Sequence, residues 1–392
     1  MRPNTINTLV RGLRPFHSSI KNASPPAVSA AAVEMDPEPE FFPPTPSKSA
    51  LELAMTTNKP LHAWSREQIK EIYQTPLIEL MHSAQLQHRK YHDPTKVQLC
   101  TLMNIKSGGC TEDCKYCSQS NRYSKDTGVK AERMVQVDEV IEAAKEAKAN
   151  GSTRFCMGAA WREMTGRKNG LKKVGEMVKA VHDMGMESCV TLGMINEEQA
   201  KELKDAGLTA YNHNIDTSRE HYKKVITTRS YDQRLKTIKN VQNSGIKACT
   251  GGILGLGETE DDHVGFLYTL SNMSPHPESL PINRLVPIKG TPMYEEVKHK
   301  RVKLDAIVRT IATARLIMPE AIIRLAAGRY TMKEHEQAMC FMSGCNAVFT
   351  GKQMLTTQCN GWDEDKAMLK RWGLEPMESF SYKPKEVHAC SA

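Results

Sequence analysis

From residue 133 onward the chain repeats one unit four times: an amphipathic helical stretch, a glycine and a short apolar run. The glycines are Gly151, Gly185, Gly207 and Gly245, and the apolar runs span residues 152–159, 186–193, 208–216 and 246–254. A glycine after a helical stretch is typical of a left-handed C-cap. Short apolar runs are typical of parallel strands buried on both faces. The repeat therefore predicts an α/β fold.

Four more apolar runs extend the alternation to eight strands. They span residues 97–105, 281–288, 321–328 and 346–351. Strands that alternate with helices pair in parallel through right-handed crossovers, and eight such units make a (β/α)8 TIM-type barrel. A doubly wound open sheet is the alternative, but no GxGxxG motif opens a helix after the first strand. We expect the barrel domain over residues 61–375.

The N-terminus has the composition of an organellar transit peptide. Residues 1–33 contain Arg2, Arg11, Arg14 and Lys21 and no acidic residue, so they supply four of the eight net positive charges. This composition favours import into the mitochondrion, to the matrix, over a plain disordered tail. We expect a Pro-rich linker over residues 34–60 and a C-terminal tail over residues 376–392.

Composition excludes several classes of function. With 40% hydrophobic and 25% charged residues, the chain has the profile of a soluble globular protein. No apolar run is long enough to span a membrane. Outside residues 1–33 the charges are interleaved, so no nucleic-acid partner is expected. The 11 cysteines are too few for a disulfide scaffold at this length, which points to a reducing compartment and to metal binding.

Three cysteines follow the first expected strand. Cys110, Cys114 and Cys117 form a C-x3-C-x2-C pattern, in the loop position where barrel enzymes keep their chemistry. Three thiolates from one loop suit a [4Fe–4S] cluster that keeps one iron open for another ligand. Structural zinc with a remote fourth ligand, or simply buried cysteines, are the alternatives.

Three further cysteines share one depth. Cys156, Cys189 and Cys249 fall five, four and four residues after their helix-ending glycines, on three different strands. Side chains at matched depth form layers inside a barrel, so these thiols could hold a second metal centre, although core packing is the alternative. Arg324, on another strand, would be a buried charge that needs an anionic partner. From the residues alone it is a counter-ion.

Longer motifs carry a family resemblance. C-x3-C-x2-C with Tyr116 before its last cysteine resembles the radical S-adenosylmethionine (SAM) superfamily. Within that superfamily the chain resembles the biotin synthase family, in an organelle-targeted form, from about residue 61 to 375. The motifs, in chain order, are CKYCSQSNRY, STRFCMGAAW, YNHNIDTS, ITTRSYDQR, GGILGLGET, PINRLVPIKGTP, RLAAGR and AMCFMSGCN.

The resemblance implies an enzyme, a sulfurtransferase that inserts sulfur into dethiobiotin to form biotin, with sulfur donated by an inner [2Fe–2S] cluster. It implies that Cys110, Cys114 and Cys117 ligate a [4Fe–4S] cluster and that Cys156, Cys189, Cys249 and Arg324 ligate the [2Fe–2S] cluster. The implied SAM contacts are Tyr116, Asn214, Asp216, Arg234 and Gly252. The implied substrate contacts are Asn212, Asn214, Asn283, Thr356 and Thr357.

The resemblance also implies partners: a ferredoxin- or flavodoxin-type electron donor, the iron–sulfur assembly machinery and a second copy of the chain in a homodimer. Another radical SAM enzyme of similar architecture, lipoyl synthase-like or hydrogenase maturase-like, is the first alternative, and a non-catalytic iron–sulfur carrier is the second. Lipoyl synthase would need a second cysteine-rich motif outside the strands. No role is assigned to the remaining cysteines, Cys100, Cys340, Cys345, Cys359 and Cys390.

Overall fold

The computed structural model describes residues 48–354 and 357–380. The predicted transit peptide, residues 1–33, lies outside the described residues, as does the first part of the predicted linker. All described residues belong to one compact unit that begins at Lys48.

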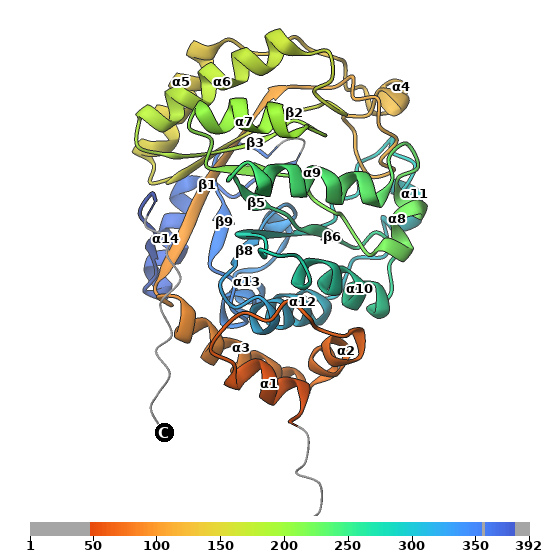
Figure 1. Cartoon of the computed structure of the whole chain (residues 1–392), viewed down its shortest axis with the longest axis vertical. Helices are drawn as coiled ribbons and strands as arrows, with labels where there is room; N and C mark the ends of the chain where they lie inside the picture. Colours follow the sequence, from red (N-terminus) through yellow and green to blue (C-terminus); the bar gives the residue numbers. More distant parts are fainter. Residues whose placement is uncertain (1–47, 355–356, 381–392) are drawn as a thin grey trace, which may run out of the picture. The chain divides into compact units, whose positions relative to one another are not determined.

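Eight parallel strand positions close into a barrel, as the alternation predicted (Figure 1). The ring order is β1, β2, β3, β4, β5, β7, β8 and β9, and β9 pairs back to β1. The strands are β1 (Lys96–Lys106), β2 (Arg154–Ala159), β3 (Glu187–Thr191), β4 (Ala210–Asn212), β5 (Lys247–Cys249), β6 (Gly252–Leu254), β7 (Ser279–Arg284), β8 (Ile322–Leu325), β9 (Ala347–Phe349) and β10 (Glu375–Pro376).

The fifth strand departs from the prediction, because the run 246–254 is broken into β5 and β6. β5 pairs with β4 and touches β7 at one residue pair, whereas β6 pairs with β7 and forms a single bridge with Asp216. Gly251 lies at the break, and a Cβ atom there would stand 1.9 Å from the carbonyl oxygen of Pro281. The backbone of the fifth strand thus approaches β7 more closely than any side chain allows.

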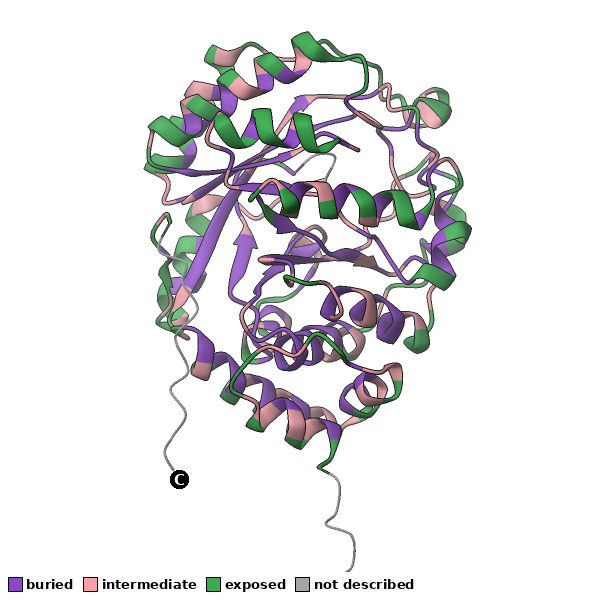
Figure 2. Cartoon of the chain, in the orientation of Figure 1, coloured by how far each residue is buried: buried purple, intermediate pink, exposed green. Residues whose placement is uncertain are grey.

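The helices form the outer layer, and their exposed residues lie on the outside of the molecule (Figure 2). They are α1 (Ala50–Thr56), α2 (Arg66–Gln74), α3 (Leu77–Tyr91), α4 (Ser124–Thr127), α5 (Val137–Ala149), α6 (Lys168–Asp183), α7 (Glu197–Asp205), α8 (Arg219–Val225), α9 (Tyr231–Asn243), α10 (Glu260–Ser271), α11 (Tyr294–Val297), α12 (Leu304–Ile317), α13 (Glu334–Met342) and α14 (Trp362–Trp372). The described residues also form two 3-10 turns, Asn121–Tyr123 and Arg329–Thr331. The four helix-ending glycines all have positive φ, between 72° and 96°, which confirms the predicted C-caps.

The linker prediction was wrong where α1 forms. Ser49 and Glu52 make a capping box that starts α1, and Ala50 and Ala54 are buried in the main hydrophobic core. The Pro-rich composition ends just before this capping box. The composition of residues 34–60 as a whole therefore did not indicate that a helix begins within them. α1, α2 and α3 lie together below the barrel helices in Figure 1.

The start of the predicted C-terminal tail also belongs to the folded unit. β10 pairs in parallel with β1, and the backbone amide of Met377 donates to the Val97 carbonyl at 2.8 Å. The amide of Phe380 donates to Glu187 at 2.8 Å. The rest of the tail lies outside the described residues.

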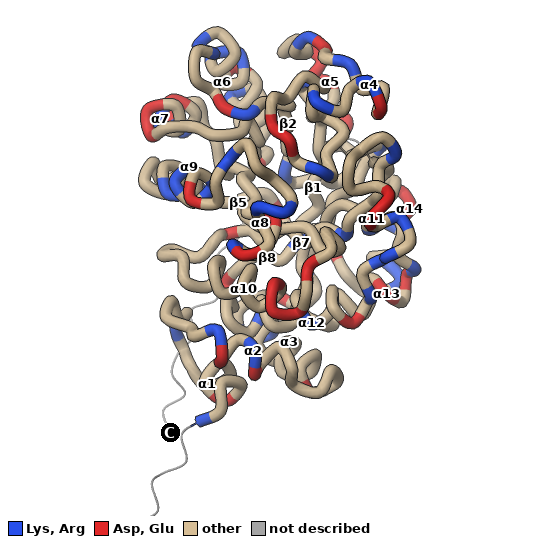
Figure 3. Tube along the Cα trace, turned by 90° about the vertical axis from the view of Figure 1, so that its right-hand side faces the viewer, with Lys and Arg blue, Asp and Glu red and all other residues tan. Residues whose placement is uncertain are grey.

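The surface of the described chain is polar and mixed in charge. Lys and Arg alternate with Asp and Glu on the outer helices (Figure 3). Among the described residues, no helix is both long and apolar enough to cross a membrane.

Candidate functional site

The C-x3-C-x2-C loop follows β1 at the carboxyl end of the barrel, where the sequence placed it. The loop folds back on itself, because the Cys117 amide donates to the Cys114 carbonyl at 2.9 Å and the Asn121 amide donates to the Cys110 carbonyl at 2.7 Å. Its three cysteines therefore occupy one compact turn. Such a turn can present several thiolates to one cluster.

A second segment, residues 225–228, anchors this loop from outside. Asp113 accepts hydrogen bonds from the amides of Thr227 and Thr228 at 2.9 and 3.1 Å. The Lys115 amide donates to the Val225 carbonyl at 3.1 Å. The loop is thus held by a part of the chain that lies more than 100 residues away, directly after α8.

Burial disfavours the charged form of the loop thiols. Burial raises the pKa of Cys110 and Cys114, and it raises the pKa of Cys117 to about 11. Binding to iron requires thiolates, so cluster assembly here would release protons. The donor set, three soft sulfur ligands in one turn, fits an iron–sulfur cluster.

The second set of cysteines lines the barrel interior at matched depth, as the glycine spacing predicted. Cys156 and Cys189 are direct register partners on β2 and β3. On β4, Cys189 pairs with Ala210, whereas Cys249 pairs with Asn212, two residues further along the strand. An offset of this kind between strands is expected from the stagger of a closed barrel. All three are buried in one cluster. Three thiols from three strands therefore face one another.

Interactions among these thiols shift the pKa values of Cys189 and Cys249 in opposite directions. The interaction with Cys189, aided by Arg324, lowers the pKa of Cys249 to about 6 despite burial. Contacts with Cys156 and Cys249, together with burial, raise the pKa of Cys189. The donor chemistry and the nearby cation fit a second iron–sulfur centre.

Arg324 is fully buried on β8, beside these thiols. Its Nη1 donates to the Ser279 hydroxyl at 2.8 Å and lies 3.6 Å from the Cys249 sulfur. Its Nη2 donates to the Gln98 side-chain oxygen, while its Nε has no hydrogen-bond partner among the described residues. Burial opposes the charge, but Cys100 and Cys249 raise the pKa of Arg324 above its ordinary value. Its shorter contacts thus go to the oxygens of Ser279 and Gln98, and the Cys249 sulfur lies farther away.

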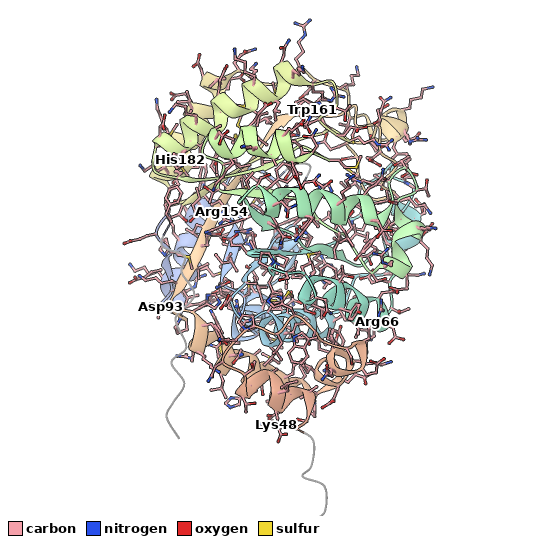
Figure 4. All side chains as sticks on the ribbon, viewed as in Figure 1. Lys48, Arg66, Asp93, Arg154, Trp161 and His182 are labelled. Atoms are coloured by element: carbon pink, nitrogen blue, oxygen red, sulfur yellow. The ribbon has the colours of Figure 1, made fainter. Side chains whose placement is uncertain are left out.

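A buried ion network closes the barrel beneath the thiols, and the sequence analysis missed it. Arg154, labelled in Figure 4, starts β2 and is completely buried. It contacts Glu187 at 2.6 Å and Glu278 at 2.7 Å. No motif marks these residues, because their partnership arises only when β2, β3 and β7 are brought together.

Four of the predicted SAM contacts form one unit. Tyr116 donates to Asp216 at 3.1 Å. Arg234 pairs with the same Asp216 oxygen and also donates to the Asn214 carbonyl at 2.5 Å. Burial opposes the charge on Arg234, but Asp216 raises the pKa of its guanidinium. Arg234 is not a surface charge, because its side chain is buried.

The predicted substrate residues also lie close together. Asn212 donates to Asn214 at 3.3 Å and lies 3.5 Å from the Cys249 sulfur. Asn283 donates to the Gly252 carbonyl at 2.8 Å and accepts from the Ala327 amide at 3.1 Å. Thr356 lies outside the described residues.

Gly252 serves close packing at this site. A Cβ atom there would stand 2.5 Å from the Asp216 carbonyl oxygen and 2.6 Å from Phe266. The glycine therefore lets the Asp216 backbone lie against β6. Gly252 itself does not line the pocket.

One pocket of about 320 Å³ joins these groups. Its wall includes two cysteines of the loop, the three barrel cysteines and most of the predicted polar contacts. These are Cys114, Cys117, Cys156, Cys189, Cys249, Tyr116, Asn212, Asn214, Asp216, Arg234, Asn283 and Thr357. Cys110 and Arg324 are not part of its wall.

Two pocket residues escaped the sequence analysis. Arg229 is buried, and its Nε and Nη1 atoms have no hydrogen-bond partner among the described residues, although Glu112 lies 3.6 Å away. His213 is buried with Nε2 equally unpartnered there, and burial lowers the pKa of its imidazole. Arg229 belongs to the motif ITTRSYDQR and His213 to the motif YNHNIDTS, and these motifs could have indicated that both residues lie at the site.

The unassigned cysteines divide into two groups. Cys340 and Cys345 belong to the main hydrophobic core, in agreement with a packing role, and Cys359 is half-buried. Cys100 instead joins the cluster of Cys156, Cys189 and Cys249. Cys390 lies outside the described residues. Within residues 48–354 and 357–380, no three His, Cys, Asp or Glu side chains are gathered as a single metal ion would require.

Comparison with known proteins decides the family. The Radical SAM superfamily profile matches residues 104–267, and the Biotin and Thiamin Synthesis associated domain profile matches residues 281–375. A protein of Saccharomyces cerevisiae named "Biotin synthase, mitochondrial" is 74% identical over 336 residues, which are 85% of this chain and 89% of that protein. The chain belongs to the biotin synthases.

Other biotin synthases extend this similarity. The Schizosaccharomyces pombe protein named biotin synthase is 60% identical, over 81% of this chain and 87% of that protein. The Arabidopsis thaliana protein, named mitochondrial, is 54% identical over 84% of this chain and 86% of its own length. The names of the Saccharomyces cerevisiae and Arabidopsis thaliana proteins agree with the predicted mitochondrial location of this biotin synthase.

Solved structures confirm the fold of this biotin synthase. The FeFe-hydrogenase maturase HydG from Carboxydothermus hydrogenoformans superimposes with a TM-score of 0.70 at 16% identity, covering 84% of this chain and 79% of that chain. Methylornithine synthase superimposes with a TM-score of 0.66 at 16% identity, covering 80% of this chain and 94% of that chain. At this identity the likeness shows the barrel alone.

Proposed function

We propose that this biotin synthase converts dethiobiotin to biotin by SAM-dependent insertion of sulfur. One observation carries the proposal: a single pocket is lined by thiols of both cysteine sets, with Asn, Asp and Arg side chains between them. A non-catalytic iron–sulfur carrier would not need the polar groups between two thiol sets. A lipoyl synthase-like or maturase-like activity is disfavoured by the 74% identity to a biotin synthase.

Cys110, Cys114 and Cys117 would hold a [4Fe–4S] cluster, and SAM would occupy its open iron. When bound and reduced, the cluster would supply one electron for the reductive cleavage of SAM, and this radical chemistry would remove hydrogen from an unactivated C–H position. The chain's own contribution is to fix the loop, through Asp113 and the segment 225–228. It also buries the Cys114 side chain away from water.

Asp216 and Asn214 would bind the ribose hydroxyls of SAM. Asp216 is held by Tyr116 and Arg234 from two sides, so its free oxygen keeps a fixed direction. Arg234 would bind the SAM carboxylate through the N–H groups that it does not use in its contacts with Asp216 and Asn214. Gly252 allows this unit to lie against the strand. A prepositioned carboxylate reduces the cost of orienting the bound cofactor.

Asn212 and Asn283 would bind the ureido ring of dethiobiotin, because an amide matches a urea group donor to acceptor. Asn214 lies next to Asn212 and would contact both SAM and dethiobiotin. Thr357, in the pocket wall, and Thr356 would bind the substrate carboxylate. The substrate would thus lie between the loop thiols and the barrel thiols.

Cys156, Cys189, Cys249 and Arg324 would hold a [2Fe–2S] cluster that supplies the sulfur atom. A short-lived carbon radical needs its sulfur within contact distance, and the barrel thiols line the same pocket as the proposed substrate residues. Consumption of this cluster would require the iron–sulfur assembly machinery to rebuild it.

A ferredoxin- or flavodoxin-type protein would supply electrons to the enzyme. We infer that the protein works as a homodimer in the mitochondrial matrix, after removal of residues 1–33.

Anaerobic reconstitution with iron and labelled sulfide, followed by one turnover in unlabelled medium, tests the function. We expect labelled biotin from dethiobiotin and SAM. Cys114→Ser should form no 5′-deoxyadenosine but keep a [2Fe–2S] spectrum, whereas Cys189→Ala should cleave SAM and form no biotin. Cys340→Ser, a buried thiol outside both sets, is the control. Unlabelled biotin would exclude the inner cluster as the donor, and absence of biotin would contradict the function.

Import and processing are tested separately on the protein isolated from its native cells. Its N-terminal peptide should begin beyond about residue 30, as a cleaved leader requires. Intact Met1 in the bulk of the protein would contradict removal of the leader.

A further inference from the structure

The cysteine loop, residues 110–117, turns its acidic side chains inward and its lysine outward. Glu112 is 2% exposed and lies 3.6 Å from the Arg229 Nε. The Asp113 carboxylate accepts from the Thr228 amide at 3.1 Å. Lys115 is instead partly exposed, and it forms no ion pair with any residue that the structure describes. The loop therefore presents a positive charge to the surface, although its sequence contains two acids and one lysine.

Two other segments border the loop on its surface side. The Lys115 amide donates to the Val225 carbonyl at the end of α8, and the Met293 amide donates to the Lys115 carbonyl just before α11, both at 3.1 Å. Gly290 lies against α4, since a Cβ atom there would stand 2.4 Å from the Asp126 carbonyl oxygen. α4, α8 and α11 lie on the right-hand side of Figure 1, the side that faces the viewer in Figure 3.

The loop and these segments carry basic side chains that reach the surface. We call this set the basic surface, and it consists of Lys115, Arg122, Lys125, Lys223, Lys224 and Lys289. Within the described part of the chain, none of the six forms an ion pair. The other charges of α8 are paired, because Arg219 contacts Asp232 and Glu220 contacts Arg66, each at 2.7 Å. The lysines at the end of α8 thus keep their full charge toward solvent.

Few acidic residues offset this charge. On the same segments, Glu295 is exposed but pairs with Lys298 at 2.5 Å. Asp126 and Glu296 are the remaining exposed acids there that form no ion pair with a described residue. The basic surface therefore has a net positive charge.

The position of this surface matches a need of the proposed reaction, which requires an electron from outside. Cys110 and Cys117 are half-buried, so the loop is thin on its outer side. On its inner side, Cys114 and Cys117 line the pocket that SAM and dethiobiotin would fill. An electron carrier would therefore approach from the surface side. Attraction between opposite charges raises the rate of such encounters and orients them.

A protein fits this surface better than a membrane does. Binding in a membrane interface needs large apolar side chains that insert beside the basic ones. The exposed large hydrophobic side chains of the described chain are Ile78, Leu86, Met342 and Phe380, and none belongs to these segments. The surface is thus charged without an apolar part.

We propose that the basic surface is the docking site of an acidic protein that carries one electron. The inference rests on the proposed function, in which the cysteine loop holds a [4Fe–4S] cluster. In the docked pair the reduced partner gives up one electron, the cluster takes up that electron, and no proton or covalent bond changes. Salt screens attraction between exposed charges, so docking should weaken as ionic strength rises.

The test compares two reductants on the reconstituted full chain. One is a reduced plant-type [2Fe–2S] ferredoxin, an acidic protein, and the other is photoreduced deazariboflavin, which is small and uncharged. Lys223→Glu combined with Lys224→Glu should raise the KM for ferredoxin by about ten-fold or more, measured by formation of 5′-deoxyadenosine from SAM. The rate with deazariboflavin should not change. The KM of the wild type for ferredoxin should rise with sodium chloride, and that of the variant should depend less on salt.

Matched variants control for the change in total charge. Lys201→Glu combined with Lys204→Glu makes the same change at two exposed lysines of α7, outside the basic surface, and should keep the wild-type KM. Arg122→Glu combined with Lys125→Glu changes the basic surface on a different segment and should repeat the selective loss. Thermal unfolding checks that every variant folds.

The possible failures are distinguishable. If the wild type forms no 5′-deoxyadenosine with deazariboflavin, the proposed function itself is wrong. If the wild type is active and both surface variants keep its KM and salt dependence, the basic surface is not the docking site and the proposed function stands. Equal losses with both reductants would show that these side chains support the loop, which also overturns the proposal. Binding to anionic phosphatidylglycerol vesicles that the variants abolish, with an unchanged KM for ferredoxin, would assign the surface to a lipid instead.

Discussion

Asp113 and Thr228 hold each other through three hydrogen bonds, although 115 positions separate them in the chain. The Asp113 amide donates to the Thr228 hydroxyl at 3.1 Å, and the Thr228 amide and hydroxyl donate to the Asp113 carboxylate at 3.1 and 2.8 Å. Asp113 lies between Cys110 and Cys114, so this pair fixes the loop that carries the outer thiols. The motif ITTRSYDQR therefore stabilises the motif CTEDCKYC.

Replacement of Thr228 by Val should loosen this loop. The change keeps the shape of the side chain but removes its hydroxyl, which bonds to Asp113 and to Glu112. We expect the free energy of unfolding to fall by about 1–3 kcal/mol and the loop amides to exchange hydrogen faster. Thr165→Val, at an exposed hydroxyl that bonds to Glu163, is the control. Equal exchange in the loop of both variants would contradict the anchoring role.

Asp113 should also make stability depend on pH in acid. Burial raises the pKa of its carboxyl, but hydrogen bonds from Thr227 and Thr228 outweigh burial and lower the pKa to about 2. A carboxyl with a depressed pKa stabilises the fold above its unfolded pKa, about 4. That contribution is lost as the pH falls from about 4 to about 2. Urea unfolding of the apoprotein across this range should show a smaller loss of stability for Asp113→Asn than for the wild type. Parallel curves would contradict this assignment.

Arg154→Leu should destabilise the barrel strongly. The change leaves Glu187 and Glu278 buried without their cation, and loss of one partner from a buried ion pair costs about 3–5 kcal/mol. The triple variant with Glu187→Gln and Glu278→Gln should recover part of the loss, because no uncompensated charge remains. Urea unfolding measures both variants. A triple variant no more stable than Arg154→Leu would contradict the electrostatic explanation.

Two glycine-to-alanine substitutions should have opposite effects. At Gly251 the added Cβ would meet the Pro281 carbonyl oxygen at 1.9 Å, and we expect a loss of about 3 kcal/mol or more. At Gly175, inside α6, the nearest atom is the Ala206 Cβ at 3.7 Å, and we expect a gain of up to about 1 kcal/mol. Thermal unfolding compares the two proteins. A tolerated Gly251→Ala would show that β5 and β6 can move away from β7.

The sequence by itself determined the barrel and the two cysteine sets. Glycines such as Gly151 and Gly245 mark helix ends because few other residues adopt a positive φ readily, and the apolar runs after them follow from local backbone preference. The depth of Cys156 and Cys189 could be counted from these glycines, and the two residues proved to be register partners. Both signals depend on residues that are near one another in the chain.

Only the tertiary structure decided which distant residues meet. Cys100 joins Cys156 because the barrel closes through β1, and Arg154 reaches Glu278 because β2 and β7 enclose the same interior. The break at Gly251 depends on how closely β7 approaches. These contacts are set by strand register and closure, which no local pattern records. The sequence therefore identified the cysteines and polar residues that line the pocket, and the packing of the barrel decided which residues they contact.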